Sequence, residues 1–172
     1  MPRETSKVRD RVLPYFSGRG ADLGGGGSHP EMPLDKLLPD SILVDWQPGA
    51  DVVTNLEFPL PFADGELDYL WSSHTLEHLW AWQLALADWV RVLRPGGGVL
   101  GLYLPHADYY DNAWNSDHKV ELRPGGVSEV LKRLGMRIEL SELDVDDVPL
   151  KDRPERHVET GRYSFLLVAI KP

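Results

Sequence analysis

The sequence contains no cysteine among its 172 residues. This absence excludes disulfides, thiolate nucleophiles and metal centres held by cysteine. Long apolar runs are also missing, since the longest covers only Phe165 to Ile170, whereas a membrane-spanning helix needs about 20 residues. Residues 1–7 lack the apolar stretch of a secretory signal. We therefore expect no membrane span and a cytoplasmic location.

Clusters of basic residues are absent as well. The formal net charge is −9, and the longest basic run is the pair Lys132-Arg133. Nucleic-acid binding depends on clustered Lys and Arg side chains that neutralise phosphates, so a nucleic-acid partner is disfavoured. A cationic ligand suits this acidic chain better. Apolar residues make up 42% of the chain, and its length fits one folded domain over residues 1–172.

Short apolar segments alternate with helical or loop segments along the chain. Helical spacing of apolar residues predicts helices over 5–16, 76–93 and 126–134. Alternation of this kind predicts a mostly parallel sheet covered by helices, that is, an α/β fold. No helix separates the last two strands, so we expect the final strand to be antiparallel. The strands themselves are predicted over 19–23, 41–46, 51–55, 66–73, 99–104, 135–143 and 163–170.

A glycine cluster, Gly24 to Gly27, follows the first predicted strand and the acid Asp22. At the carboxyl edge of an open α/β sheet, glycines let the backbone approach a ligand closely. Asp45 ends the second predicted strand, 21 residues after Gly24. An acid at this distance typically accepts hydrogen bonds from ribose hydroxyls. The loop over 55–62, after the third strand, is placed to cover a base.

The common phosphate-binding motifs do not account for this cluster. The Gly-x-Gly-x-x-Gly motif fails from Gly18, Gly24 and Gly25, and the chain has no Gly-Lys pair. A cofactor with a ribose and a base but no phosphate remains. S-adenosylmethionine (SAM) fits this description, and its sulfonium cation suits an acidic site.

Three segments resemble one family in the same order. Asp22-x-Gly24-x-Gly26-x-Ser28 is similar to an acid-x-Gly-x-Gly-x-Gly motif, with Ser28 at the last glycine. Residues 56–79 resemble a base-covering loop that enters the fourth strand, and residues 89–106 resemble a helix that leads through Arg-Pro-Gly-Gly into the fifth. The family is the class I SAM-dependent methyltransferases, close to the bacterial methyltransferase type 11 group.

This resemblance covers nearly the whole chain and implies a three-layer, Rossmann-like fold. The sheet would have seven mostly parallel strands with an antiparallel last strand. The first helix after the glycine motif would be shortened, because Pro30, Pro33 and Pro39 leave room for at most a short helix around residues 34–38.

The resemblance also implies roles for individual residues. Gly24 and Gly26 would line the methionine part of SAM, with Asp22 near its ammonium group. Asp45 would hold the ribose hydroxyls. The remaining implied cofactor contacts are Asn55 and Leu56 beside the adenine, and Ser72 and Ser73 after the fourth strand.

Two histidines are the candidate catalytic bases. His74 follows the fourth predicted strand and His106 ends the fifth, at the same edge of the sheet. An acceptor hydroxyl needs a base that titrates near neutral pH, which histidine supplies. We expect methyl transfer from SAM to a small-molecule, sugar or lipid acceptor, recognised by loops 105–123 and 144–162. A non-catalytic protein of this fold that binds or regulates a partner is the alternative.

The start of the long predicted helix raises two further questions. His74 and His78 lie four residues apart, a spacing that can hold a metal. The HExxH motif is absent, so we expect no metal site and expect His78 to be hydrogen-bonded within the fold. Core packing or a homodimer interface would each bury the second apolar stripe of this helix, which consists of Trp82, Ala85, Trp89 and Val92.

Overall fold

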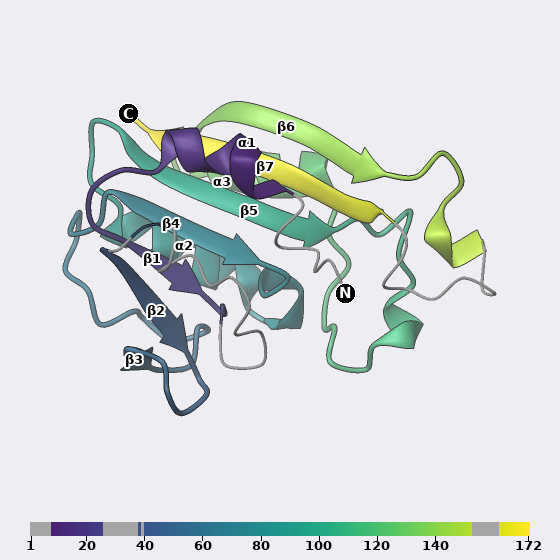
Figure 1. Ribbon diagram of the computed structural model, residues 1–172, viewed down its shortest axis with the longest axis horizontal. Helices are drawn as coiled ribbons and strands as arrows, with labels where there is room; N and C mark the ends of the chain where they lie inside the picture. Colours follow the sequence, from purple (N-terminus) through teal and green to yellow (C-terminus); the bar gives the residue numbers. More distant parts are fainter. Residues whose placement is uncertain (1–7, 26–37, 39, 153–161) are drawn as a thin grey trace.

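A seven-stranded sheet runs through the chain in the order β3-β2-β1-β4-β5-β7-β6 (Figure 1). The structure, a computed structural model, describes residues 8–25, 38, 40–152 and 162–172. The strands are β1 (Gly20–Leu23), β2 (Ser41–Asp45), β3 (Val52–Val53), β4 (Tyr69–Ser73), β5 (Gly98–Pro105), β6 (Arg137–Val145) and β7 (Tyr163–Lys171).

The sheet is parallel from β3 to β5 and antiparallel around β7. All pairings among β1, β2, β3, β4 and β5 are parallel, whereas β7 runs antiparallel to both β5 and β6. Parallel neighbours need a crossover connection, whereas antiparallel neighbours can be joined by a short loop. The expected mostly parallel sheet with an antiparallel last strand is confirmed.

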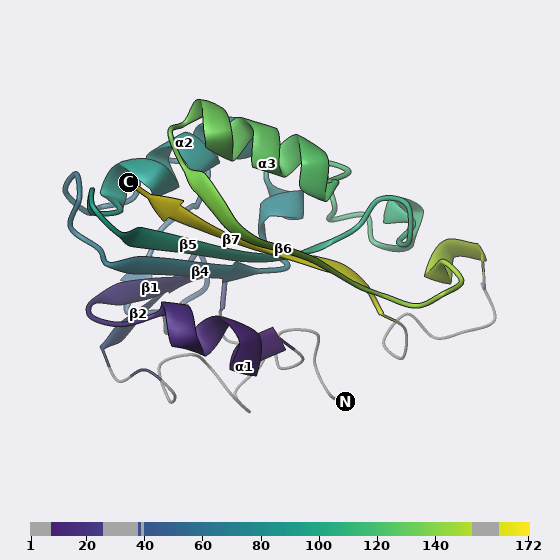
Figure 2. The same cartoon turned by 90° about the horizontal axis from the view of Figure 1, so that it is seen from above.

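Helices lie on both faces of the sheet (Figure 2). Helices α2 (Trp82–Val92) and α3 (Pro124–Arg133) cover one face, and α1 (Arg9–Val12) lies on the other. The three-layer arrangement is therefore confirmed. The short helix expected around 34–38 falls almost wholly outside the described residues. None of the helices in the described ranges has the length and apolar character needed to cross a membrane.

The helix predicted over 76–93 is broken near its start. Residues Leu76–His78 form one 3-10 turn, and α2 begins only at Trp82. Leu79 has an extended backbone, with φ −98° and ψ 120°. The N–H group of Ala81 then donates to the Glu57 carboxylate at 3.1 Å, and a negative charge at a helix N-terminus is favourable. The sequence pattern did not reveal this break, because Leu76 and Leu79 are both buried in the core and so fit the apolar spacing of a continuous helix.

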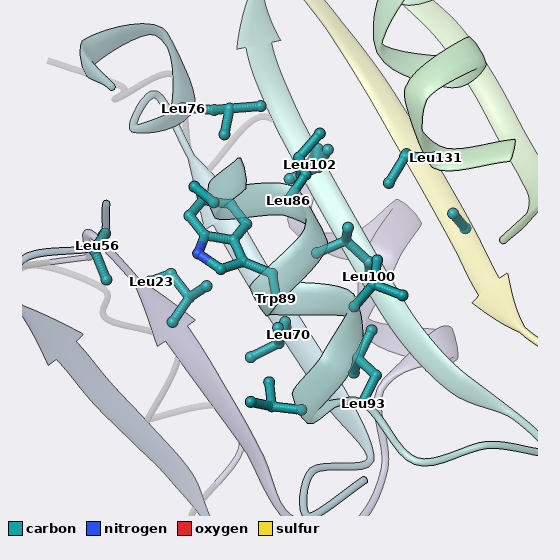
Figure 3. Close-up of a cluster of buried hydrophobic side chains, with 14 of the residues drawn as sticks. Leu23, Leu56, Leu70, Leu76, Leu86, Trp89, Leu93, Leu100, Leu102 and Leu131 are labelled. Carbon is teal, nitrogen blue, oxygen red and sulfur yellow. The ribbon is translucent and has the colours of Figure 1, made fainter. Parts of the chain in front are cut away.

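The main core lies between the sheet and the face formed by α2 and α3 (Figure 3). Trp89 of α2 is fully buried there and belongs to the same cluster as Leu70 of β4 and Leu100 of β5. Trp82, Ala85 and Val92 belong to or pack against the same cluster. Ala85, Trp89 and Val92 of the second apolar stripe are therefore core residues, and Trp82 packs against the core while remaining partly exposed.

Candidate functional site

The chain bends sharply after β1, and the bend requires glycine at two positions. Gly24 has a φ of +77°, in the left-handed region that favours glycine. A Cβ atom on Gly24 would lie 2.1 Å from Thr75 Oγ1, and one on Gly25 would lie 2.6 Å from the carboxyl carbon of Asp22. The bend is therefore packed directly against a hydroxyl and a carboxylate. Gly26 lies outside the described residues.

Asp45 lies beside this bend. The parallel register pairs Leu23 with Val44, and the N–H group of Gly24 donates to the Val44 carbonyl at 2.8 Å. Asp45 is only 3% exposed, and its Oδ1 accepts a hydrogen bond from the backbone N–H of Gln47 at 2.9 Å. We call the group of Asp22, Gly24, Gly25 and Asp45 the glycine edge. It combines two buried carboxylates with a closely packed backbone.

The two residues expected beside adenine take different positions in the loop after β3. Asn55 is exposed, and its Oδ1 accepts the N–H of Glu57 at 2.9 Å in a local turn. Leu56 is 5% exposed and packs in the main core. Asn55 therefore lies at the surface of the loop, whereas Leu56 anchors the loop from inside.

Hydroxyl side chains at the end of β4 join the glycine edge to the centre of the sheet. Ser72 is fully buried and donates to the Leu23 carbonyl at 3.1 Å. The hydroxyl of Thr75, a residue that sequence reasoning did not single out, lies 3.3 Å from the same oxygen and 3.2 Å from the Ser73 carbonyl. The Ser73 hydroxyl is buried and has no hydrogen-bond partner among the described residues. Ser73 is therefore the member of this group with an unused polar atom.

His74 follows β4 with a backbone φ of +50°. Non-glycine residues adopt such angles rarely, and functional sites are among the places where they do. Its Nδ1 lies 3.4 Å from Glu77 Oε1, and its Nε2 lies 3.3 Å from Ser164 Oγ. A carboxylate beside one ring nitrogen favours a hydrogen there and leaves the other nitrogen to accept a proton. His74 thus has the arrangement of a general base.

His106 meets the same strand, β7, but in a different way. Its backbone N–H donates to the Tyr163 carbonyl at 2.8 Å, and its Nδ1 accepts the Asp108 N–H at 3.1 Å. In the neutral ring the hydrogen is therefore on Nε2. Burial lowers the pKa of His106, Asp108 opposes this, and Arg123 and Lys151 add to the lowering. Near pH 7 His106 offers an N–H donor rather than an open acceptor nitrogen.

Sequence reasoning missed a buried carboxylate beside His74. Glu77 is 1% exposed, and apart from the long contact of Oε1 with His74 Nδ1 at 3.4 Å its oxygens have no hydrogen-bond partner among the described residues. His78 Nε2 and His118 Nε2 lie 4.0 and 3.8 Å from its Oε1. We call Glu77 with His74, His78 and His118 the histidine cluster. Three imidazoles thus surround one carboxylate.

Charge within the histidine cluster follows from this burial. Burial raises the pKa of Glu77, but His74 and His78 lower it, and the net direction is downward, so Glu77 is ionised near pH 7. Burial lowers the pKa of His118 to about 4, with Glu77 opposing. His118 is therefore neutral over most of the physiological range. His78 and Glu77 are neighbours in sequence, but His118 arrives 40 residues after His78, and no local spacing would have signalled it.

Comparison with known proteins adds three findings to this geometry. Residues 23–101 match the family model of a methyltransferase domain. No curated protein matches the chain. The solved structures that resemble it include SAM-dependent methyltransferases of three organisms.

The protein from Archaeoglobus fulgidus is 22% identical over 95% of this chain and 91% of that chain, with a TM-score of 0.68. The protein from Mesorhizobium loti is 18% identical over 97% of each chain, with a TM-score of 0.69. The protein from Aquifex aeolicus is 16% identical over 96% of this chain and 94% of that chain, with a TM-score of 0.64. At these identities the likeness establishes the fold. The domain match runs from the last residue of β1 through the first half of β5.

Proposed function

We propose that this chain is a class I SAM-dependent methyltransferase and that it transfers the methyl group of SAM to a small-molecule, sugar or lipid acceptor at the carboxyl edge of its sheet. The observation that carries the proposal is the His74–Glu77 pair, which lies directly after β4. SAM supplies a methyl group already activated by its sulfonium charge. The protein therefore needs mainly to align the acceptor and to remove its proton.

The glycine edge has the groups that this cofactor requires. A Cβ atom on Gly24 would meet Thr75 and one on Gly25 would meet Asp22, so glycine at both positions lets the backbone pack closely beside the Asp22 carboxylate. Asp22 would bind the cofactor's ammonium group, and Asp45 would bind the ribose hydroxyls. The unused Ser73 hydroxyl is a further donor at the same edge. Asn55 and Leu56 would border the adenine, and Gly24 and Gly26 would line the methionine part of SAM.

His74 would take the acceptor's proton on Nε2. Glu77 beside Nδ1 would stabilise the imidazolium that forms, because an ionised carboxylate next to a ring nitrogen favours the charged ring. Ser164 lies beside Nε2 and would exchange its contact with that nitrogen for the acceptor. His106 would assist through its Nε2–H, as a donor that orients the acceptor rather than as the base.

The long connection between β5 and α3 supports a bound acceptor on this side. It contains His106 and Tyr110, and the Tyr110 ring lies 4.8 Å from that of Tyr163 on β7. Long loops at the carboxyl edge of a sheet commonly cover substrates. The acceptor would therefore contact β7 and this loop, on the opposite side of β4 from the glycine edge.

Two measurements test the proposal. Calorimetry with SAM and with its demethylated product, S-adenosylhomocysteine, measures cofactor binding, and a screen for release of that product measures turnover. The screen covers sugars, lipid headgroups, and small alcohols and amines. Binding with turnover of at least one acceptor class is expected. Tight binding without turnover of any class would favour the alternative, a non-catalytic binding protein.

The matched variants are His74→Gln and His106→Gln. Loss of a general base costs about 10²–10⁴-fold in rate, so His74→Gln should lower kcat by that amount and leave product affinity unchanged. His106→Gln should lower kcat less, because glutamine keeps an N–H donor. Equal rates in His74→Gln and the native protein would remove the proposed base.

A further inference from the structure

We propose that Glu77, His78 and His118 bind a divalent transition-metal ion of the Zn²⁺ class. One ligand atom from each lies within 4.8 Å of the other two. The sequence predicted no metal site, because the HExxH motif is absent even though the spacing of His74 and His78 can hold a metal. The structure brings together a different set of three residues, Glu77, His78 and His118. His118 enters it from the loop after β5, and Glu77 from the 3-10 turn after β4.

The backbone holds these two segments together. The carbonyl oxygen of Glu77 accepts hydrogen bonds from the N–H groups of Lys119 at 2.8 Å and Val120 at 3.2 Å. The loop that carries His118 is therefore tied to the turn that carries Glu77. The juxtaposition does not depend on the side chains themselves.

Hydrogen bonds on the far side of each ring fix which nitrogen faces Glu77. His78 Nδ1 lies 3.0 Å from the carbonyl oxygen of Asp117, which can only accept, so Nδ1 donates. Asn112 donates through Nδ2 to the Val120 carbonyl, which orients its Oδ1 toward His118 Nδ1 at 3.1 Å. Both rings therefore use Nδ1–H as donor. In each neutral ring the lone pair is on Nε2, the nitrogen nearest Glu77.

Three lone-pair atoms thus face one another with no hydrogen between them. Glu77 Oε1 lies 4.0 Å from His78 Nε2 and 3.8 Å from His118 Nε2, and both Glu77 oxygens are buried without a hydrogen bond from the described residues. A buried carboxylate left in this state is costly. The His74 Nδ1 contact at 3.4 Å reaches only the Glu77 oxygen, whereas a cation would contact all three lone-pair atoms at once.

The donor set and the outer contacts match those of protein metal sites. Two imidazoles and one carboxylate are a common ligand set for zinc and for related ions, and they leave a fourth position open. Bonds of about 2.0–2.2 Å put neighbouring ligand atoms about 3.4 Å apart in a tetrahedral site, so the three ligand atoms here, which lie within 4.8 Å of one another, would move closer together when they bind an ion. Ring N–H donors bonded to a carbonyl or amide oxygen are the usual outer support of metal-binding histidines. His74 Nδ1, 3.4 Å from Glu77 Oε1, would support the carboxylate in the same way.

Metal titration of the untagged full chain, stripped with a chelator, tests the site. Zn²⁺ followed by calorimetry should bind one ion per chain. Co²⁺ should give the visible absorption bands of a four-coordinate site, and Mg²⁺, which prefers oxygen ligands, should not compete. Loss of an outer-shell contact typically weakens metal binding by roughly 10–100-fold, so Asn112→Ala should do so, and Glu77→Gln and His118→Gln should weaken it more.

His106→Gln is the matched control, because it removes a histidine outside the three-residue group and should leave Zn²⁺ affinity unchanged. Circular dichroism and thermal unfolding check that each variant is folded. If Glu77→Gln or His118→Gln fails to fold, Asn112→Ala, at a partly exposed loop position, still decides the question. The absence of saturable Zn²⁺ binding, or equal affinity in Asn112→Ala and the native protein, would overturn the proposal. Neither result depends on methyl transfer, so the proposed function stands or falls separately.

Discussion

Asp45 in the glycine edge and Glu77 in the histidine cluster are both buried carboxylates that follow parallel strands, yet their surroundings differ. The Oδ1 atom of Asp45 is bonded by the backbone two residues ahead, at Gln47. The oxygens of Glu77 accept no hydrogen bond from the described residues, and their neighbours include a histidine from a distant loop. The Asp45 carboxylate is held by its own turn. The Glu77 carboxylate is held in place by tertiary packing, and its oxygens can still bind a further ligand.

The strongest test of the glycine edge is Gly24→Val. A β-branched side chain there meets both a positive φ and the Thr75 hydroxyl. Strain and overpacking each cost about 1–3 kcal/mol, so stability in urea should fall by roughly 2–5 kcal/mol and binding of S-adenosylhomocysteine should be lost. Gly126→Ala in α3 is the control, because a Cβ there meets no atom within 4 Å and should be neutral or stabilising by up to about 1 kcal/mol. Native stability in Gly24→Val would mean that the bend is not constrained as described.

Asp45→Asn distinguishes two roles of this side chain, its hydrogen bond within the turn and its proposed contact with the ligand. The Asn side-chain oxygen can still accept the Gln47 N–H, so the turn should persist. A hydrogen bond to a charged group contributes about 1.5–3 kcal/mol, so affinity for S-adenosylhomocysteine should fall by roughly 10–100-fold in calorimetry. Unchanged affinity would show that Asp45 has only a structural role in its turn.

Substitution of Arg91 tests how α2 supports the loop between β3 and β4. Its guanidinium donates to the carbonyls of Leu60 and Phe62 and to the carboxylates of Asp64 and Asp88. Arg91→Ala should lower the free energy of unfolding by about 1–2 kcal/mol, since several part-exposed hydrogen bonds are lost together. Arg91→Lys should recover only part of this, because lysine lacks the planar fork. If Arg91→Lys has the same free energy of unfolding in urea as the native protein, then only the positive charge of Arg91 matters.

The smallest expected effect concerns the pH dependence of stability. The pKa of His106 is lowered in the folded protein, so the unfolded chain takes up a proton there more readily. Its contribution to stability is present above the ordinary histidine pKa of about 6.5 and is lost as pH falls below it. His106→Gln should therefore flatten the fall in urea stability between pH 7 and pH 5, measured with a chelator present. A slope identical to that of the native protein would contradict the direction of this pKa change.

Much of the fold was predictable from local patterns. The strands at 41–45, 69–73 and 163–171 appear within the segments predicted for them or extend them by one residue, because an apolar run bounded by turn residues is a strong local signal. The helix over 76–93 was predicted too long, because apolar spacing alone does not reveal the extended backbone at Leu79 or the Glu57 carboxylate that meets the start of α2.

The candidate site likewise has one part that was predictable from the sequence and one part that was not. The amino-acid sequence by itself determined the glycine edge: Asp22 lies near the end of β1, Gly24 follows that strand, and Asp45 ends β2. Parallel strands place their carboxyl ends at one edge of a sheet. Only the tertiary structure decided the histidine cluster, since Glu77 and His118 are brought together by backbone hydrogen bonds between segments some 40 residues apart. The directions of the ring nitrogens depend on Asp117 and Asn112, two contacts that exist only once the loop after β5 has folded onto the turn after β4.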